Sequence, residues 1–236
     1  MIQHFKKYSH LAIAFTILSS IVSATIFVRA DEQIVDFSGT GRPNEQTDGG
    51  SRGNCGGAIA SNHQLTALIP QTMSLTVSEA PTFWVYIPDD PKNLEYGELI
   101  LQDEIAERPI YRIRYHLENT PGVVRLNAPS DREYQLEPQK LYRWYFKVKC
   151  TGGNQVAVGG LIERVTLPPS AQNNRGYLDN KIWHEILTEV GNRLRISPDN
   201  SVIREEWKLL LNAPGVDLKH IGDRPLVACC EMEQRE

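Results

Sequence analysis

The sequence predicts a mainly β protein with helices at its C-terminal end, in which an antiparallel immunoglobulin-like β-sandwich of about seven strands carries a docked C-terminal helical hairpin. Two observations predict this fold. Short strand-like segments recur between residues 65 and 165, two of them with clear alternation of apolar and polar residues, and turn sequences rich in Pro, Gly, Asn and Asp separate them. After Pro168-Pro169 the apolar residues recur every three or four positions, which is typical of amphipathic helices. With 236 residues, of which 41% are apolar, the chain can build one medium-sized core.

The best-patterned strand is Leu141–Cys150, where one face is apolar or aromatic and the other face is mainly basic. Ile110–Leu117 repeats this alternation, so both segments predict a sheet with one buried face. The Leu136-x-Pro138 sequence before Tyr142 is typical of a tyrosine corner, in which the Tyr hydroxyl bonds back to the corner backbone. The full set of predicted strands is Leu65–Ile69, Phe83–Ile87, Glu98–Gln102, Ile110–Leu117, Val123–Asn127, Leu141–Cys150 and Gln155–Val165.

Two helices are predicted after these strands. Apolar residues at helical spacing run from Leu178 to Leu194, and Arg193 and Arg195 lie near the C-terminal end, where cations suit the helix dipole. Pro198–Ser201 offers caps for a second amphipathic helix. Because a pair of helices cannot bury its apolar faces alone, we expect the pair to pack on the sandwich.

Four segments are expected along the chain: a signal peptide at 1–30, a Gly-rich leader or covering loop at 31–57, the β-sandwich at 58–168, and the helical hairpin with the C-terminal tail at 177–236. Lys6 and Lys7 precede an uncharged apolar run, Leu11–Val28, as in secretory signals. Cleavage after Ala24 or Ala30 fits the small-residue preference, and an uncleaved anchor is the alternative, since the run nearly reaches a bilayer-spanning length. The rest of the chain is therefore expected to be exported, to the periplasm, the outer envelope or the extracellular space.

The charge of the chain argues against some partners. Removing residues 1–30 takes away three basic residues and no acidic one, which changes the formal net charge from −4 to −7. An acidic chain without a Lys/Arg cluster is a poor candidate for binding nucleic acid. Contact with a membrane is expected only through the signal segment, if that segment is retained.

All four cysteines, Cys55, Cys150, Cys229 and Cys230, follow the predicted signal, and an even number in an exported chain predicts disulfides. The hypothesis is a bond between Cys55 and Cys150, which would close a long loop and contribute about 4–5 kcal/mol on the chain-entropy model. A bond between the neighbours Cys229 and Cys230 would hold Cα atoms about 3.8 Å apart, below the usual range for disulfides. The pairing of these two residues is left open.

The sequence predicts no catalytic, cofactor or metal site, and hence a non-enzyme. Gly49–Gly53 matches the G-x-S-x-G string of a nucleophile elbow, but neither a strand nor a helix is expected to flank it. A Cys–His nucleophile built on Cys55 is disfavoured, because an oxidising compartment favours a disulfide. The histidines after the signal are scattered singly and lack zinc-ligand spacing: His63, His116, His184 and His220.

Acidic residues flank the strand segment Leu99–Leu101, and two interpretations are open for them. Paired carboxylates could serve glycoside hydrolysis, if two of them face one cleft at the required separation. Charged residues also guard exposed edge strands against aggregation, which is the preferred interpretation. The residues are Glu95, Glu98, Asp103, Glu104 and Glu107.

Three aromatic residues, Trp84, Tyr86 and Tyr145, fall on the opposite parity of their strands from the predicted core. They form a possible binding surface, for example for stacking on a carbohydrate. The preferred alternative is that they pack under the helical hairpin, which must bury its apolar stripe against something.

Five segments stand out as a combination: GGSRGNC at Gly49–Cys55, LTALIP at Leu65–Pro70, TVSEAPTFWVYIP at Thr76–Pro88, LYRWYFKVKC at Leu141–Cys150 and PLVACC at Pro225–Cys230. Together they resemble the DUF928 family, a cyanobacterial exported family whose domain has no assigned function. The resemblance implies export, a β-rich domain and cysteines placed as they are here. It supplies no catalytic residue.

The leading hypothesis is a non-catalytic envelope or extracellular module that mediates binding or assembly with an unknown envelope protein or glycan. It rests on the export signal, the sandwich pattern and the lack of a catalytic template. One alternative is a cell-wall or polysaccharide hydrolase that uses the acidic strand. Another is a pilus-type assembly chaperone, in which an exposed strand edge completes the sheet of a partner.

Overall fold

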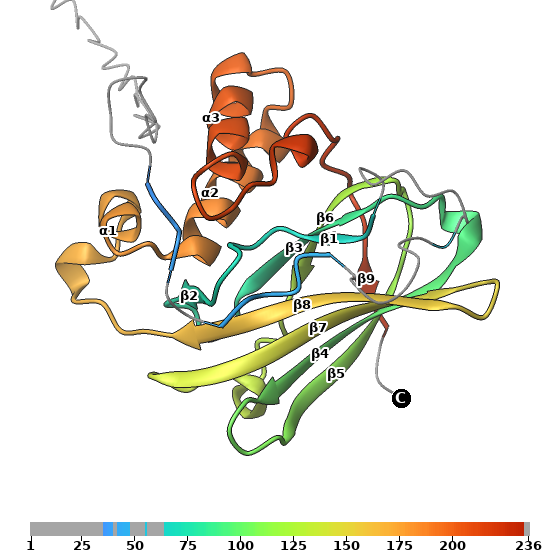
Figure 1. The fold of residues 1–236 in the computed structure, drawn as a ribbon, viewed down its shortest axis with the longest axis horizontal. Coiled ribbons are helices and arrows are strands. Elements are labelled where there is room, and N and C mark those ends of the chain that lie inside the picture. Colours follow the sequence, from blue (N-terminus) through green and yellow to red (C-terminus); the bar gives the residue numbers. More distant parts are fainter. Residues whose placement is uncertain (1–34, 40–41, 48–54, 56–63, 234–236) are drawn as a thin grey trace, which may run out of the picture.

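The computed structural model describes residues 35–39, 42–47, 55 and 64–233. These residues form two β-sheets, with three helices near the C-terminal end (Figure 1). The prediction of a mainly β protein with C-terminal helices is therefore confirmed. The predicted signal peptide, 1–30, lies outside the described residues, and so does the Gly49–Gly53 string. In the part of the chain that is described, no helix combines the length and the apolar character needed to span a bilayer.

The larger sheet has six strands in the order β2-β8-β7-β4-β5-β9, and the smaller sheet has three in the order β1-β3-β6. The strands are β1 (Thr66–Ala67), β2 (Ser74–Thr76), β3 (Thr82–Ile87), β4 (Leu94–Asp103), β5 (Pro109–His116), β6 (Gly122–Asn127), β7 (Lys140–Cys150), β8 (Gln155–Arg164) and β9 (Glu231–Met232). The helices are α1 (Asn174–Asp179), α2 (Trp183–Ile196) and α3 (Ser201–Leu211), with short 3₁₀ turns at Pro91–Asn93, Arg132–Tyr134, Pro169–Ala171 and Lys219–Ile221. All seven predicted strand segments are present, and β2 and β9 are additions to them.

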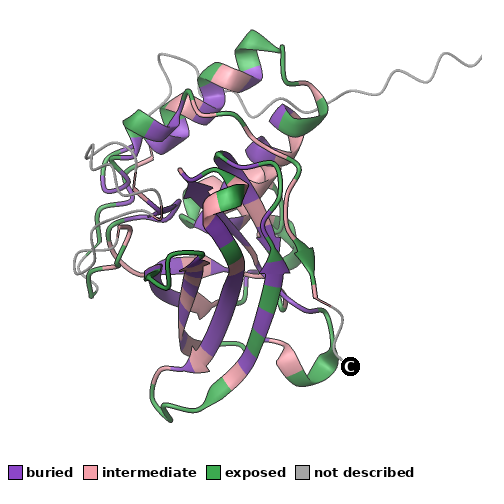
Figure 2. Ribbon diagram, turned by 90° about the vertical axis from the view of Figure 1, so that its right-hand side faces the viewer, coloured by how far each residue is buried: buried purple, intermediate pink, exposed green. Residues whose placement is uncertain are grey.

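β7 lies in the middle of the larger sheet, because β4 pairs with it on one side and β8 on the other. Its predicted alternation is confirmed, since Tyr142, Trp144, Phe146 and Val148 are each at most 1% exposed. The Tyr142 hydroxyl accepts a hydrogen bond of 2.8 Å from the backbone N–H of Glu137, which is the bond expected of a tyrosine corner. Buried residues run along the strands and along the helix surfaces turned toward the sheets (Figure 2).

The finer prediction of an antiparallel immunoglobulin-like sandwich is not confirmed. The larger sheet curls into a half-barrel (Figure 1), and its outermost strand β2 runs parallel to β8. β2 has only three residues, which is too short for an alternating pattern to be recognised in the sequence. The acidic strand β4 was also expected at an exposed edge, and that expectation is wrong because β7 and β5 pair with it on both sides.

Three helices take the place of the predicted helical hairpin, which is likewise not confirmed. α1 ends at Asp179, and Lys181 has a φ of 55°, in the left-handed region. The amide of Ile182 donates to the carbonyl of Tyr177, and the amide of Lys181 donates to that of Leu178. This is the Schellman pattern of helix C-termini, in which glycine usually takes the left-handed position. Because a lysine occupies that position here, no glycine marks the break in the sequence.

Tryptophan contacts hold α2 and α3 on the smaller sheet. Trp84 of β3 meets Trp207 of α3 edge-on, with ring centroids 5.8 Å apart, and Trp84 Nε1 donates to Thr188 Oγ1 at 3.1 Å. Gly191 of α2 leaves room for the Trp84 ring, since a Cβ at this glycine would lie 2.7 Å from it. α3 starts where predicted, because the Asn200 side chain accepts hydrogen bonds from the first amides of the helix.

Two irregular segments join the sheets at their edges. The N-terminal strap, residues 42–47, pairs with Gly159 of β8 and with Thr66 of β1, so it connects the larger sheet to the smaller one. The C-terminal strap, residues 225–233, pairs first with Val123 of β6 and then, as β9, with β5. Each strap therefore connects one edge of the smaller sheet to the larger sheet. In Figure 1 the C-terminal strap runs from the helices down to β9.

The described parts of the predicted leader, 31–57, lie against the folded core. Phe37 is 5% exposed and meets Trp183 of α2 edge-on, with ring centroids 4.9 Å apart. Gly215, with a φ of 78°, permits this close approach, because a Cβ there would lie 2.2 Å from the backbone nitrogen of Ser38. The segment that precedes the N-terminal strap thus contributes to the core of the protein.

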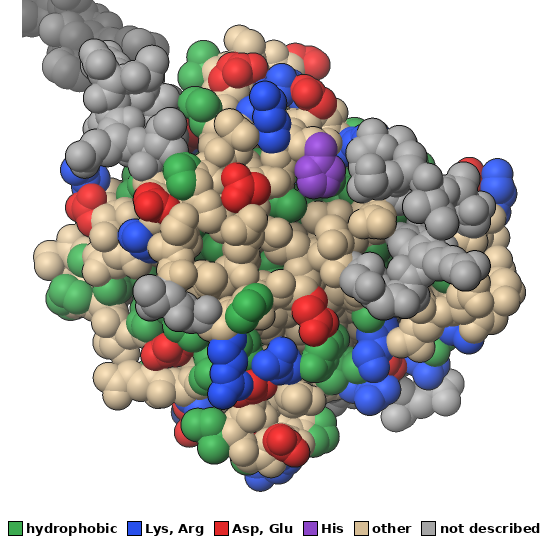
Figure 3. Space-filling model, viewed as in Figure 1, with side chains coloured by type: hydrophobic (Ala, Val, Ile, Leu, Met, Phe, Trp, Pro, Cys, Tyr) green, Lys and Arg blue, Asp and Glu red, His purple; other side chains and the backbone are tan. Residues whose placement is uncertain are grey.

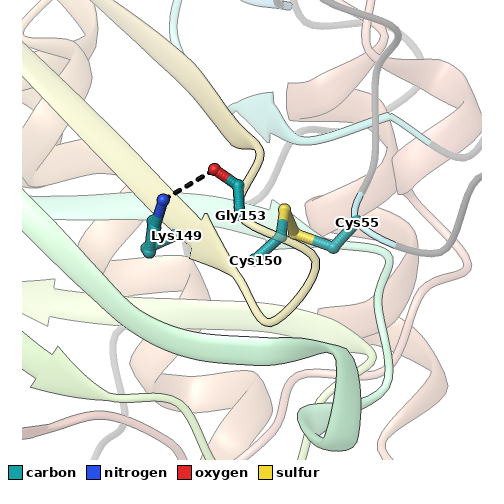
Figure 4. Close-up of a disulfide and its surroundings, with 4 residues drawn as sticks. All are labelled: Cys55, Lys149, Cys150 and Gly153. Carbon is teal, nitrogen blue, oxygen red and sulfur yellow. Dashed lines mark hydrogen bonds between the residues drawn. A yellow bond between two sulfur atoms is a disulfide. The ribbon is translucent and has the colours of Figure 1, made fainter.

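Two disulfides are present. The predicted bond between Cys55 and Cys150 is confirmed, with Cα atoms 5.3 Å apart at the end of β7 (Figure 4). Lys149 Nζ donates to the Gly153 carbonyl at 2.6 Å and supports the turn that follows (Figure 4). The second disulfide joins the neighbours Cys229 and Cys230, whose Cα atoms are 3.7 Å apart.

Replacing Cys55 and Cys150 together by alanine should lower the free energy of unfolding by about 4–5 kcal/mol, because the unfolded chain regains the entropy of a long loop. Replacing Cys229 and Cys230 by alanine is the matched control and should cost about 1 kcal/mol or less, since neighbouring residues enclose almost no loop. Urea unfolding followed by tryptophan fluorescence measures both values. Equal losses for the two double variants would contradict this assignment.

Gly191→Ala should lower the free energy of unfolding by about 1–3 kcal/mol, because the added methyl group overlaps the Trp84 ring. This loss is expected although alanine is the better helix former by about 1 kcal/mol. Gly152→Ala is the control, since a Cβ at Gly152 meets nothing within 4 Å. Urea unfolding of the two variants makes the comparison, and a neutral Gly191→Ala would show that Trp84 is not tightly packed under α2.

Candidate ligand-binding site

Three arginines from different elements line one surface pocket of about 620 Å³. Arg125 comes from β6, Arg195 from the last turn of α2, and Arg204 from α3. The C-terminal strap adds another wall through Pro225 and Leu226. A pocket of this volume can hold a small molecule or a few residues of a peptide. We call it the arginine pocket.

The pairing of β6 with β3 places Arg125 in this pocket. Arg125 lies opposite Trp84 in the antiparallel register, so both side chains leave the sheet on the face that α2 covers. Arg125 Nη1 donates to Asn192 Oδ1 of α2 at 2.8 Å. Burial lowers the pKa of Arg125, and the nearby positive charge of Arg195 lowers it further. The charge of the Arg125 guanidinium is therefore poorly compensated.

The neighbouring arginines show which partners can compensate a guanidinium charge in this region. Arg193, also in the last turn of α2, forms an ion pair with Glu206 of α3 at 3.0 Å. Arg204 donates to the backbone carbonyl of Pro198, which holds it at the turn between the two helices. Among the described residues that line the arginine pocket, none carries a carboxylate. On the face shown in Figure 3, by contrast, acidic and basic side chains are interspersed.

The remaining wall of the arginine pocket is apolar. Leu194 and Ile196 contribute from α2, and Leu226 contributes from the strap. Ile196 is 82% exposed, so most of its side chain is in contact with solvent. Ligand pockets commonly combine an apolar lining with a few polar groups that fix the orientation of the ligand. This arrangement can bind a ligand that has both an anionic group and an apolar part.

A comparison with protein families decides where this chain belongs. The family model Domain of Unknown Function (DUF928) matches residues 47–226. The chain belongs to the DUF928 family. No curated protein and no solved structure matches it. The matched range of the DUF928 domain contains all three arginines of the pocket and ends inside the C-terminal strap, before Cys229.

The aromatic residues considered as a binding surface do not come together in this DUF928 protein. Trp84 and Tyr86 of β3 are each 2% exposed. Trp84 is covered by the helices, and the guanidinium of Arg224 lies 5.2 Å from the centre of the Tyr86 ring. Tyr145 is half-buried on β7, in the other sheet. Neither Trp84 nor Tyr86 therefore offers a ring face on which a ligand could stack from solvent.

The buried and partly buried carboxylates of the acidic strand are paired with basic side chains. Glu98 and Glu104 each form an ion pair with an arginine, at 2.9 Å and 2.7 Å. Asp103 accepts from the Ala106 amide and pairs with Lys140 at 2.8 Å, and these contacts lower the pKa of Asp103 to about 2. A general acid for glycoside hydrolysis needs a raised pKa. The contacts of Asp103 thus lower its pKa, whereas a general acid needs a raised pKa.

Two carboxyl groups on the helices do have raised pKa values, and burial is the main cause for both, Glu185 and Glu206. Glu185 accepts hydrogen bonds from Thr76 Oγ1 at 2.7 Å and from the two backbone amides that follow Thr76. It therefore fixes the end of β2 to the first turn of α2. Glu206 is occupied by its ion pair with Arg193. Both groups serve the packing of the helices.

A serine and a histidine form a buried pair at the start of α2. His184 Nδ1 donates to the Thr82 carbonyl at 3.1 Å, and Nε2 lies 2.9 Å from the Ser74 hydroxyl, which also donates to the Leu161 carbonyl at 3.0 Å. Ser74 and His184 are 2% and 4% exposed, which keeps them from contact with a substrate. Cys55 is in a disulfide and is no partner for a histidine. Among the described residues, no cluster of His, Cys, Asp or Glu could hold a metal ion.

His184→Gln should remove a pH dependence of stability. Burial lowers the pKa of His184 from 6.5 to about 4, so between these pH values the unfolded chain takes up a proton that the folded chain does not. The wild-type protein should therefore lose about 3 kcal/mol more than His184→Gln when the pH falls from 7 to 4, at 1.36 kcal/mol per pH unit. Urea unfolding at three pH values measures this, and parallel curves for the two proteins would contradict it.

Proposed function

We propose that this protein is an exported, non-catalytic binding module that docks an acidic segment of an envelope partner protein in the arginine pocket. One observation carries the proposal: Arg125, Arg195 and Arg204 converge on one pocket whose described lining contains no carboxylate. The chain as a whole is acidic, with a formal net charge of −4, so the positive charge of this pocket is a local feature. A ligand with carboxylates supplies the missing counter-charge.

The chemistry of the pocket supports a peptide as the ligand. Guanidinium groups bind carboxylates through two parallel hydrogen bonds, and such bonds are stronger than neutral ones. Ile196 and Leu226 offer apolar surface next to these cations, which an apolar side chain of the same peptide can cover. The disulfide between Cys55 and Cys150 supports an oxidising compartment, in agreement with the export signal expected in the sequence.

Other partners and functions receive less support from the described residues. An acidic glycan could satisfy the same arginines, although the described lining of the pocket holds no aromatic ring for a sugar to stack on. For a hydrolase that uses the acidic strand, Glu98 and Asp103 would have to be released from their ion pairs. A pilus-type chaperone needs a free strand edge, and the two straps cover parts of the edges of β1, β6 and β5.

A synthetic hexapeptide of alternating glutamate and leucine should bind the purified protein, and a peptide with glutamine in place of glutamate should bind at least tenfold more weakly. Arg125→Gln and Arg204→Gln should each reduce the affinity about tenfold, because each removes a charge-assisted hydrogen bond of about 1.5 kcal/mol. Affinity should also fall as salt is raised. Isothermal titration calorimetry measures these values.

Arg132→Gln, at an exposed arginine that does not line the pocket, is the matched control and should leave the affinity unchanged. Trigalacturonate serves as the glycan probe in the same titration. Tighter binding of trigalacturonate than of the acidic peptide would replace the peptide with a glycan as the ligand. Equal binding by the wild type and the Arg125 and Arg204 variants would remove the arginine pocket as the site.

A further inference from the structure

The disulfide Cys229–Cys230 lies in the C-terminal strap at a place where the strap borders two pockets. Leu226 and Ala228 line the arginine pocket on one side of this disulfide. Cys230 and Met232 line a second pocket, of about 580 Å³, on the other side. Both cysteines are only half-buried, so a small reductant can reach the bond.

The disulfide Cys229–Cys230 contributes little to the overall stability of the fold. A disulfide stabilises a fold mainly by closing a loop in the unfolded chain, and the effect grows with the length of the loop. Cys55 and Cys150 are 95 positions apart, whereas Cys229 and Cys230 are adjacent. Any effect of the second bond must therefore be local, on the shape of the strap itself.

The strap changes its pairing partner at this point. Before the disulfide, the Val227 amide donates to the Val123 carbonyl of β6 at 2.9 Å. After it, the Glu233 amide donates to the Arg114 carbonyl of β5 at 3.0 Å. The residues between these two bonds thus carry the chain from the smaller sheet to the larger one. Their conformation decides whether both pairings can exist at the same time.

Where the C-terminal strap passes from the smaller sheet to the larger one, Cys230 has an unusual backbone conformation. Cys230 has a φ of 82°, in the left-handed region that residues other than glycine rarely adopt. The bond between N and Cα of Cys230 belongs to the eight-membered ring that the disulfide closes, so the ring restricts rotation about this bond. Once the ring is opened, Cys230 is free to return to a negative φ.

We propose that Cys229–Cys230 is a site of thiol–disulfide exchange with a dithiol reductant, and that opening it loosens the C-terminal strap and weakens ligand binding in the arginine pocket. This second effect rests on the function proposed above for that pocket. One thiolate of the dithiol attacks a sulfur of the disulfide, and the other cysteine leaves as a thiolate and takes up a proton. The second thiol of the reductant then displaces the first cysteine, so the reductant is oxidised to a disulfide and both cysteines become thiols.

The test begins with a titration of the full-length exported protein with dithiothreitol, followed by alkylation and peptide mass mapping. Cys229 and Cys230 should be alkylated at lower dithiothreitol concentrations than Cys150, which is 1% exposed. Hydrogen exchange should then become at least tenfold faster at the amides of Val227 and Glu233, and remain unchanged in α3. Binding of the glutamate–leucine hexapeptide should weaken about tenfold and recover on reoxidation.

Two variants keep the test independent of the reductant. Cys229→Ser combined with Cys230→Ser should reproduce the fast exchange and the weak binding while the Cys55–Cys150 bond stays intact. Gly122→Val should displace the strap without touching a cysteine, because a Cβ at Gly122 would lie 2.6 Å from Val227 and 2.9 Å from the Pro225 carbonyl. It should likewise weaken binding of the hexapeptide.

The outcomes separate this inference from the proposed function. Reduction of Cys229–Cys230 with unchanged amide exchange and unchanged affinity overturns the inference and leaves the proposed function in place. Reduction of Cys55–Cys150 before Cys229–Cys230 also overturns it. Failure of the oxidised protein to bind the hexapeptide overturns the proposed function, and the exchange at Val227 and Glu233 then still decides whether the ring holds the strap.

Discussion

β3 is buried on both of its faces, and the arrangement of the whole molecule depends on this constraint. Phe83 points toward the larger sheet, where its ring centroid lies 4.6 Å from that of Trp144 on β7. Trp84, the next residue, points toward the helices and meets Trp207. Because successive residues of a strand face opposite sides, this short segment fixes the smaller sheet between the helices and the larger sheet (Figures 1 and 2).

The arginine pocket follows from the same constraint. Arg125 is the cross-strand neighbour of Trp84, so it must leave the sheet on the side of the helices. Trp84 fills the space under α2 at Gly191, and Arg125 therefore lies beside this contact and bonds to Asn192. The last turn of α2 and the start of α3 border the same position. The positive charges of Arg125 and Arg195 repel each other there, and an anionic ligand would relieve this repulsion as Glu206 compensates the charge of Arg193.

The sequence predicted those parts of the fold whose pattern is local. Strand-like segments between turn sequences identified seven of the strands, with clear alternation in β5 and β7, and the spacing of Pro138 and Tyr142 predicted the hydrogen bond of the tyrosine corner. The break after α1 was missed, because Lys181 takes a backbone conformation that glycine usually marks. β2 and β9 were missed because two or three residues carry no periodicity, and they owe their conformation to the strands beside them.

The candidate site could not be predicted in the same way, since its members are remote in sequence. Arg125, Arg195 and Arg204 lie on three elements, and only the packing of α2 and α3 on β3 brings them together. The one local signal was a charged residue, Arg125, inside the short apolar segment Val123–Leu126. From the sequence, Arg195 is explained only by the helix dipole, which favours a cation at the C-terminal end of α2. The dipole does not predict that Arg195 lies beside Arg125.

The two straps differ in how firmly they are held, and this difference bears on the pocket. In the N-terminal strap, the Asn44 side chain accepts from the Leu161 amide at 2.8 Å, and Gln46 Nε2 donates to the Ile69 carbonyl at 2.6 Å. In the C-terminal strap, backbone pairing is joined by a hydrogen bond from Asn119 to the Ala228 carbonyl at 2.8 Å. The N-terminal strap is thus held by its side chains in addition to its backbone pairing, whereas the C-terminal strap is held mainly by its backbone. Among the described residues of the two straps, only those of the C-terminal strap line the arginine pocket, so the connection that a ligand would contact is the one held mainly by its backbone.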